Sequence, residues 1–272
     1  ETIALGRNEL NVLDLEKIRQ IIQTIKPDLL INATAYTAVD RAESEVDLAT
    51  SVNALAPRVM AEEMECLDGG FIHFSTDYVF DGFSNHPNRE TDTPNPINIY
   101  GASKLYGEYL IQQVNRRFLV FRTSWVYSLT TDNFVTKVLV WARNNSEIKI
   151  VNDQIGNPTS AIALADLVTN IVSNNKENFL DYLLEAKGIY HCAGKGALSR
   201  YEFAKEILRI APAISNVKNV EIISVSSDEF PAAAKRPSNS SLDLDLFEKK
   251  FLITIPNWQV DLYREFGFLS DG

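Results

Sequence analysis

The sequence predicts an α/β fold with a doubly wound parallel sheet and a smaller, mixed C-terminal lobe. Short apolar runs alternate with stretches of helical periodicity through the first half of the chain. Helices of this length between strands imply right-handed crossovers, which place successive strands parallel to each other. After about residue 151 the alternation loosens, and this favours a separate lobe over the carboxyl ends of the strands.

The expected elements of the first half follow in chain order. Residues 2–5 form a short apolar run that we interpret as a strand. Asp14 is a suitable N-cap for a helix that carries its apolar residues on one face and ends before Pro27. The later elements are a strand at 29–31, a helix over 48–60, a strand at 71–74, a polar loop over 81–96, a helix from about 100 and a strand at 119–121.

The second half predicts two helices and two short strands. We expect helices at 161–172 and 201–210, the latter opened by a capping-box sequence at 199–202, and strands at 189–191 and 220–225. We therefore expect residues 1–150 to form a dinucleotide-binding domain and residues 151–272 to form a substrate-binding lobe. The chain could cross back from the lobe to the first domain.

The composition excludes several classes of protein. A net charge of -10 in 272 residues disfavours nucleic acid as a partner, because phosphate binding needs a basic face. No run of about 18 apolar residues is present, so we expect no membrane span. The low cysteine count favours a reducing cytoplasm. Two cysteines and three histidines have no disulfide or metal-ligand spacing, so we expect no metal site.

Two constellations carry candidate chemistry. Tyr100 and Lys104 lie four residues apart, so they share a helix face, and an ammonium beside a phenol would lower the pKa of that phenol. This makes Tyr100 a candidate general acid, although a solvated helix face is the alternative. Thr76 and Asp77 follow a predicted buried strand, where they could bind a substrate carbonyl oxygen or simply cap a turn.

A second set of residues suits a nicotinamide cofactor. The small residues Ala33, Thr34 and Ala35 follow a strand and would let a flat cofactor lie against it, or they would allow tight helix packing. Asn53 is either a polar group behind Tyr100 or a surface amide. Arg7 stands where many NAD enzymes carry an acidic residue, so it favours the 2′-phosphate of NADPH, with NADH and an exposed loop arginine as alternatives.

Several blocks resemble those of the dTDP-4-dehydrorhamnose reductases, a family of extended short-chain dehydrogenases with a Rossmann-type sheet. The Tyr-x-x-x-Lys pair is shared by the wider superfamily, whereas the blocks TAVDRAE, STDYVFDG, TSWVY and NDQIGNPT are more specific. The resemblance covers nearly the whole chain, through residues 32–43, 75–82, 98–104, 122–127, 152–159 and 236–240.

The resemblance implies an activity: NADPH-dependent reduction of the C4 ketone of dTDP-4-dehydrorhamnose to dTDP-L-rhamnose, in nucleotide-sugar and cell-surface polysaccharide biosynthesis. In that reaction Tyr100 would donate the proton, and Lys104 would hold the nicotinamide ribose and tune Tyr100. Thr76, with Asp77 beside it, would bind the sugar at its keto carbon.

The resemblance also implies roles in ligand binding. Ala33, Thr34 and Ala35 would line the cofactor channel. Asp14 and Leu15 would lie on the adenine side, although Asp14 could be only a helix cap. On the substrate side the implied contacts are Tyr78, Trp125, Arg236 and Asn239, with Arg236 the candidate cation for the diphosphate. Trp125 could instead be an ordinary buried aromatic residue.

Two other functions compete with the reductase. Asp77 beside Thr76 is also compatible with a sugar-nucleotide epimerase or dehydratase on the same fold. The second competing function is that of a non-catalytic regulatory subunit. A regulatory partner of methionine adenosyltransferase resembles these reductases. The presence of Thr76, Tyr100 and Lys104 favours chemistry. The sequence leaves open a homodimer and a divalent cation.

The sequence departs from the family at its beginning. No G-x-G-x-x-G or related glycine loop is present, so the first βα unit, about 30 residues, is expected to be missing. We favour truncation over natural loss of cofactor binding, because a sheet with an unpaired central strand is costly.

A chain extended by such a glycine-rich unit should bind NADPH and reduce substrate, whereas the chain as written should bind NADPH poorly. Fluorescence titration with NADPH checks this expectation. An extended chain that binds no cofactor would contradict it.

Overall fold

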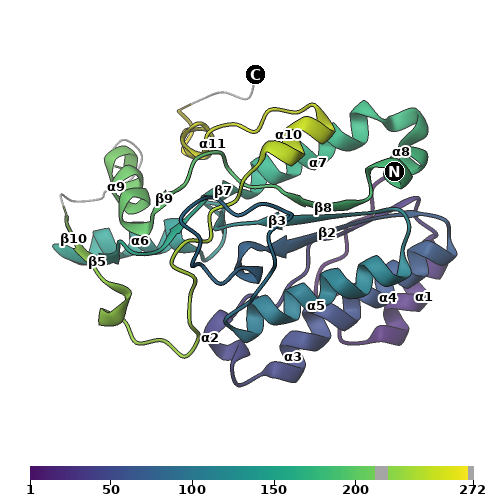
Figure 1. The fold of residues 1–272 in the computed structure, drawn as a ribbon, viewed down its shortest axis with the longest axis horizontal. Helices are drawn as coiled ribbons and strands as arrows, with labels where there is room; N and C mark the ends of the chain where they lie inside the picture. Colours follow the sequence, from purple (N-terminus) through teal and green to yellow (C-terminus); the bar gives the residue numbers. More distant parts are fainter. Residues whose placement is uncertain (212–219, 269–272) are drawn as a thin grey trace.

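The computed structural model describes residues 1–211 and 220–268, and its centre is a parallel four-stranded sheet (Figure 1). The strand order is β1-β2-β3-β8, with all three neighbouring pairs parallel. The predicted doubly wound α/β fold is confirmed. The strands are β1 Leu29–Asn32, β2 Gly70–Thr76, β3 Phe118–Thr123 and β8 Gly188–His191.

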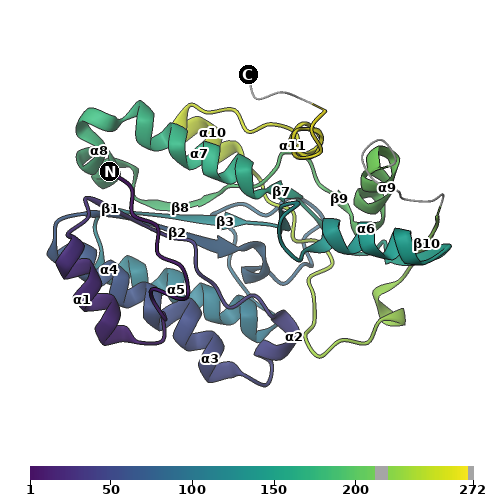
Figure 2. The same cartoon turned by 180° about the vertical axis from the view of Figure 1, so that it is seen from behind.

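Helices cover both faces of this sheet, as Figures 1 and 2 show from opposite sides. One face packs against α1 Leu15–Ile25, α4 Ala56–Cys66 and α5 Ile99–Val114 through a cluster that includes Ile18, Met64 and Ile111. The other face packs against α7 Ala161–Asn174, α8 Phe179–Ala186 and α10 Asp245–Phe251. Every residue of β3 is buried, as expected for a central parallel strand.

A second, smaller unit lies beyond the carboxyl ends of the main strands (Figure 1). Its parallel strand pair joins β5 Glu147–Val151 to β10 Glu221–Val225 and is covered by α6 Phe134–Asn144 and α9 Arg200–Ile210. The expected boundary at residue 150 falls inside β5, and β8 returns the chain to the main sheet. The short elements are β4 Val126–Tyr127, β6 Ile155–Gly156, β7 Thr159–Ser160, β9 Leu198–Ser199 and α11 Trp258–Glu265.

The predicted strand at residues 2–5 is wrong. This segment pairs with no strand of the described residues, and the side chains of Ile3 and Leu5 are exposed. A strand needs a partner for its backbone groups, and apolar composition alone does not supply one.

The predicted helix over 48–60 is interrupted. The chain forms α2 Val39–Ala42 and α3 Val46–Thr50, then a single π-helical turn, Ser51–Leu55, before α4. This widened turn lies against α5, where a side chain on Gly107 would meet the Asn53 carbonyl oxygen at 2.2 Å. The missing side chain of Gly107 therefore lets α5 lie directly on this turn, a packing detail that hydrophobic periodicity does not encode.

None of the helices in the described part of the chain is both long and apolar enough to cross a membrane.

The start of α5 is positioned by three separate contacts. The Asn98 side chain accepts a hydrogen bond from the Gly101 N–H at 2.8 Å and so caps the helix. Glu43 accepts from the Ile99 N–H at 2.8 Å, which ties the α2 end to the same turn. A Cβ on Gly101 would lie 2.1 Å from the Tyr78 carbonyl oxygen, so the helix rests directly on the backbone after β2.

Gly101→Ala should therefore destabilise the protein by about 1–3 kcal/mol, the usual cost of forced overpacking, although alanine is the better helix former. Chemical denaturation measures this change in unfolding free energy. Gly6→Ala is the control, because its new methyl meets only the flexible Glu9 side chain. Equal stability of the Gly101 variant and wild type would contradict the close contact.

Candidate active site

Tyr100 and Thr76 meet at the carboxyl end of β2. Tyr100, in the first turn of α5, is half-buried, and its hydroxyl is hydrogen-bonded to that of Thr76, the last residue of β2. The Tyr78 ring packs edge-on against the Tyr100 ring with centroids 5.8 Å apart. Two hydroxyls from different elements thus converge where a carbonyl oxygen could be bound.

Asp77 is buried and held by hydroxyl groups. The Thr76 hydroxyl donates to one of its oxygens at 3.0 Å, and the Ser124 hydroxyl donates to the other at 2.8 Å. Burial raises the pKa of Asp77, while hydrogen bonds from Ser240, Ser124 and Thr76 oppose that rise. The carboxyl is therefore anchored, and it orients the Thr76 hydroxyl.

Among the hydrogen bonds of the described residues, none joins Lys104 to Tyr100. Lys104 Nζ donates to the Phe74 carbonyl oxygen at 2.5 Å and lies 3.0 Å from His73 Nε2, inside the layer between α5 and β2. Burial raises the pKa of Tyr100, so the expected lowering by a neighbouring ammonium is wrong for this state. The physical reason is desolvation: the phenolate would be a buried anion without a paired cation.

Asn53 is fully buried, so the alternative of a surface amide is wrong. Its Oδ1 accepts from the Tyr36 N–H at 2.8 Å, and its Nδ2 donates to the Ser103 hydroxyl at 3.0 Å. Ser103 in turn donates to the Tyr100 carbonyl oxygen at 2.8 Å. Asn53 therefore connects the loop after β1 to the helix that carries Tyr100, and its amide binds backbone and hydroxyl groups.

The predicted cofactor residues differ in exposure and in their contacts. Ala33, Thr34 and Ala35 follow β1 and are exposed, so their small side chains leave the strand end open. Arg7 is exposed in a turn. Asp14 caps α1 by accepting from the Lys17 N–H at 2.9 Å, which confirms the helix-cap interpretation. The structure leaves Leu15 half-buried at the edge of the apolar cluster under α1.

Arg200 is a site residue that the sequence did not predict. Its guanidinium lies 3.7 Å from the Trp125 ring centroid and is hydrogen-bonded to the Tyr78 hydroxyl. Among the described residues it makes no ion pair, and burial lowers its pKa. In the sequence, Arg200 stands inside the capping box Ser199–Glu202, so the pattern indicates only the first residue of a helix and not a ligand-binding cation. A cation held by rings rather than by a carboxylate keeps its capacity to bind an anion.

Trp125 supports this arrangement. Its backbone has a φ of 44°, a left-handed conformation that is uncommon for a bulky residue. A Cβ on Gly156 would lie 2.5 Å from the indole, so this glycine allows the ring to fit beneath Arg200. The strained backbone therefore aims the ring at the site.

Arg236 and Asn239 come from the segment before α10. Arg236 binds Asp40 through two nitrogens, the shorter contact being 2.6 Å, and also reaches the Tyr78 hydroxyl. Asn239 donates to the Ser84 carbonyl oxygen at 2.9 Å. Arg236 thus lies with Arg200 at Tyr78, whereas the Asn239 amide holds the loop that follows β2.

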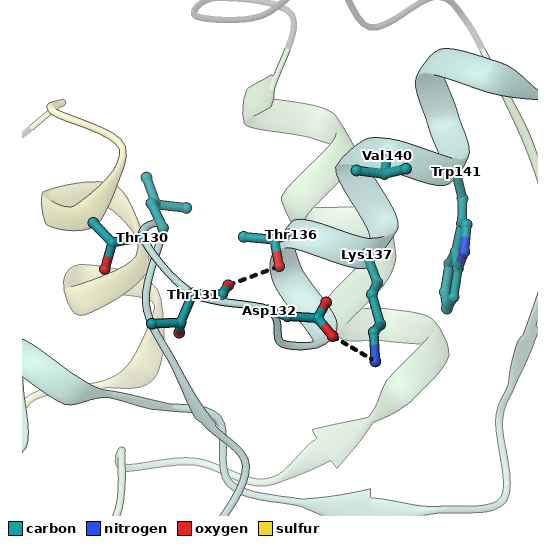
Figure 3. A pocket seen from close by; sticks show the side chains of 8 residues that line it. Thr130, Thr131, Asp132, Thr136, Lys137, Val140 and Trp141 are labelled. Atoms are coloured by element: carbon teal, nitrogen blue, oxygen red, sulfur yellow. Dashed lines mark hydrogen bonds and ion pairs between the residues drawn. The ribbon is translucent and has the colours of Figure 1, made fainter. Parts of the chain in front are cut away.

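A separate hollow of about 390 Å³ lies at the start of α6 (Figure 3). Its lining includes the Asp132–Lys137 ion pair of 3.3 Å and the Thr136 hydroxyl, which donates to the Thr131 carbonyl oxygen at 3.0 Å. Its lining contains none of the predicted site residues. The candidate active site is therefore the cluster around Tyr100, not this hollow.

Comparison with known proteins identifies the family. A family model described as the RmlD substrate binding domain matches residues 1–266. A dTDP-4-dehydrorhamnose reductase from Sinorhizobium fredii is 37% identical over 97% of this chain and 88% of its own length. The Escherichia coli K12 reductase is 36% identical over 92% of this chain and 82% of its own length.

This chain belongs to the dTDP-4-dehydrorhamnose reductase family. The family fold agrees with solved structures: a Bacillus anthracis reductase in complex with NADP has a TM-score of 0.88 and 34% identity, covering 97% of this chain and 89% of that one. A Clostridium acetobutylicum reductase has a TM-score of 0.89 and 32% identity, covering 98% and 90%. The resemblance expected from the sequence is confirmed.

The comparisons also bear on the choice between a reductase and an epimerase or dehydratase. A dTDP-glucose 4,6-dehydratase from Streptomyces venezuelae matches at 14% identity with a TM-score of 0.71, which shows the shared fold alone. The much more similar proteins from Sinorhizobium fredii, Escherichia coli and Bacillus anthracis are reductases. The epimerase or dehydratase alternative therefore rests only on Asp77, which three hydroxyl groups hold in place.

Proposed function

We propose that this chain reduces the C4 ketone of dTDP-4-dehydrorhamnose to dTDP-L-rhamnose with NADPH. The observation that carries this proposal is the hydrogen-bonded pair of Tyr100 and Thr76 at the carboxyl end of β2, in a chain of this family. A protonated phenol and a second hydroxyl at one point can polarise a ketone and then protonate its oxygen. Neither competing function is favoured by a specific contact.

The residues present fit NADPH. The exposed Ala33, Thr34 and Ala35 leave an open surface at the end of β1, and the exposed Arg7 supplies a cation for a 2′-phosphate. Lys104 would hold the nicotinamide ribose after leaving its bond to Phe74. The NADP complex of the Bacillus anthracis relative supports this choice of cofactor. When bound, NADPH supplies the hydride for C4 of the sugar.

The protein residues bind the ketone and deliver the proton. Tyr100 donates its phenolic proton to the C4 oxygen, and its raised pKa ensures that this proton is present at neutral pH. Thr76 lies within hydrogen-bond reach of Tyr100, while Asp77 orients the Thr76 hydroxyl. The Ser124 hydroxyl fixes Asp77 from the other side. The Thr76 hydroxyl has one proton, which it donates to Asp77 here, so it would turn that proton from Asp77 to the C4 oxygen when the substrate binds.

The two guanidiniums at Tyr78 could bind the diphosphate of a sugar nucleotide. Arg200 and Arg236 both reach the Tyr78 hydroxyl, and Asp40 pairs with only Arg236. The Asp77 carboxyl also interacts with Arg200, although hydroxyl groups hold it. What supports a diphosphate site is therefore two guanidiniums at one hydroxyl, of which Arg200 makes no ion pair among the described residues. Trp125 offers its ring to the sugar nucleotide, and Asn239 holds the neighbouring loop in place.

We also propose a cytoplasmic homodimer. The free Cys66 and Cys192 suit a reducing compartment. Tyr106 and Tyr109 on α5 are both exposed, at 45% and 57%, and these aromatic side chains could pack against a second copy. Light scattering of the purified protein tests the dimer.

Tyr100→Phe should reduce kcat by roughly 10²- to 10⁴-fold, because the ring remains but the proton donor is lost. NADPH oxidation with a panel of 4-keto sugar nucleotides measures the effect and identifies the substrate. The wild type and both variants are all assayed in the chain extended by the N-terminal glycine-rich unit, which is expected to bind NADPH. Tyr109→Phe, on the exposed face of the same helix, should leave kcat unchanged. Full activity of the Tyr100 variant would overturn the proposed mechanism, and an unchanged NADPH level in wild type would overturn the reductase.

Arg200→Gln should raise the Kd for dTDP by roughly 10- to 100-fold, the effect of losing a charge-assisted hydrogen bond. Calorimetry with dTDP measures this without turnover. The control is Arg209→Gln on the same helix, whose guanidinium pairs with Glu206 at 2.9 Å on the surface. Equal dTDP affinity in wild type and the Arg200 variant would remove Arg200 from the diphosphate site.

A further inference from the structure

Three buried side chains link the first loop of the sheet to the lysine of the Tyr-x-x-x-Lys pair. Asn32 ends β1, His73 lies in the middle of β2, and Lys104 lies on α5; each is at most 2% exposed. Asn32 Nδ2 lies 3.1 Å from His73 Nδ1, and His73 Nε2 lies 3.0 Å from Lys104 Nζ. The proposed reaction uses Lys104 but gives no role to His73.

The orientation of the Asn32 amide is fixed by a backbone donor. The Thr34 N–H donates to Asn32 Oδ1 at 3.0 Å, and the Thr34 hydroxyl donates to the same oxygen at 2.7 Å. A flipped amide would place its NH₂ group against the Thr34 N–H, which can only donate. Asn32 Nδ2 therefore faces His73 as a donor.

The donor on Asn32 selects the histidine tautomer. Since Nδ2 donates to His73 Nδ1, that nitrogen carries a lone pair and the ring proton lies on Nε2. A protonated ring would leave two donors facing each other inside the core, and burial indeed lowers the pKa of His73 well below its usual value. His73 is a neutral ring that presents an N–H to Lys104.

An ammonium cannot accept that N–H. All three of its hydrogens donate, so a charged Lys104 and the Nε2–H group would repel each other at 3.0 Å. A neutral amine resolves the conflict, because its lone pair accepts from His73 and one of its hydrogens is donated to the Phe74 carbonyl oxygen at 2.5 Å. Hydrogen-bond direction alone thus determines the charge state.

We propose that Thr34, Asn32 and His73 hold Lys104 as a neutral amine until the cofactor binds, which makes His73 a positioning residue for the Tyr-x-x-x-Lys pair. This inference rests on the proposed function only in assigning the cofactor to Lys104. Cofactor binding that draws Nζ away from His73 returns the amine to the charged form and takes up one proton from solvent.

The other charges around Lys104 are consistent with a neutral amine. Glu108 lies on the same helix, but both of its oxygens bind Arg122 from β3, with a closest contact of 2.7 Å. On the β2 side Lys104 faces only His73 and the Phe74 carbonyl group among the described residues. Burial lowers the pKa of Lys104 to about 7, against a partial opposing effect of Glu108.

The first test is NMR titration of the wild-type protein with labelled lysine and histidine side chains, without cofactor. The Lys104 signal, assigned by its loss in Lys104→Met, should titrate near pH 7, and the His73 ring should carry its proton on Nε2. A Lys104 ammonium that persists to pH 9, or a His73 proton on Nδ1, would overturn the proposal. Neither readout requires turnover, so the result is independent of the proposed reaction.

The second test reverses the direction of the network. In Asn32→Asp both carboxylate oxygens accept, so the His73 proton should move to Nδ1 and Nε2 should accept from a charged Lys104. In His73→Gln the new amide can present its oxygen, and the Lys104 pKa should rise by at least one unit. His86→Gln, on an exposed loop, is the control and should leave Lys104 unchanged. If the His73 ring proton stays on Nε2 in Asn32→Asp, the proposed hydrogen-bond network is contradicted.

The third test measures the proton taken up by cofactor binding. This test uses the chain extended by the N-terminal glycine-rich unit, which is expected to bind NADPH, and wild type here means that extended chain without substitution. Calorimetry with NADPH in two buffers of different ionisation enthalpy, between pH 7.5 and 9, should show uptake that approaches one proton in wild type and none in His73→Gln. The Kd for NADPH should rise up to tenfold per pH unit in wild type, because the complex binds the extra proton. The 2′-phosphate does not interfere, since a phosphate monoester titrates near pH 6. No proton uptake in wild type would overturn the linkage, whereas absence of turnover alone would overturn only the proposed function.

Discussion

The contact between the first turn of α5 and the backbone after β2 is the constraint on which the site depends. Gly101 has no room for a Cβ above the Tyr78 carbonyl oxygen, so this contact sets how far the helix can approach the sheet. That distance places the Tyr100 hydroxyl at Thr76 and, one turn later, the Lys104 amine at Phe74 and His73. Asn98 and Glu43 hold the same turn from outside. The catalytic geometry is thus a consequence of helix packing on a rigid strand end.

The elements with strong periodicity could be predicted from the sequence, and those that depend on a partner could not. The helix after Asp14 and the buried strands follow from local pattern, because cap, period and length agree. Residues 2–5 have the composition of a strand without a neighbour, and the π-helical turn at Asn53 lies where Gly107 of α5 packs against it. Pairing and helix approach are relations between distant segments, so a single local window does not contain them.

The site shows the same division between residue identity and spatial relation. Tyr100, Thr76 and Asp77 come from motifs, and the structure brings them together. Arg200 lies in no sequence motif for ligand binding, because its neighbours form the N-terminal capping box of a helix. Only the fold places its guanidinium over the Trp125 ring. The interaction of Lys104 with His73 was equally hidden, since 31 residues separate them in sequence. Charge and tautomer depend on which atoms face each other, which is a three-dimensional property.

Burial shifts the pKa of each of the two central groups toward its uncharged form, in opposite directions. Desolvation raises the pKa of the Tyr100 phenol and lowers that of the Lys104 amine, so near and above neutral pH one group retains its proton and the other loses it. An ion pair between them would be costly in this dry layer unless other groups solvated both charges. Arg200 and Arg236 both reach the Tyr78 hydroxyl, where we propose that the diphosphate binds. In the proposed mechanism, the positive charge that assists Tyr100 is therefore the Lys104 ammonium, which forms when the cofactor binds. Until then the Tyr100 phenol keeps its proton, and it can donate that proton once the ketone is bound.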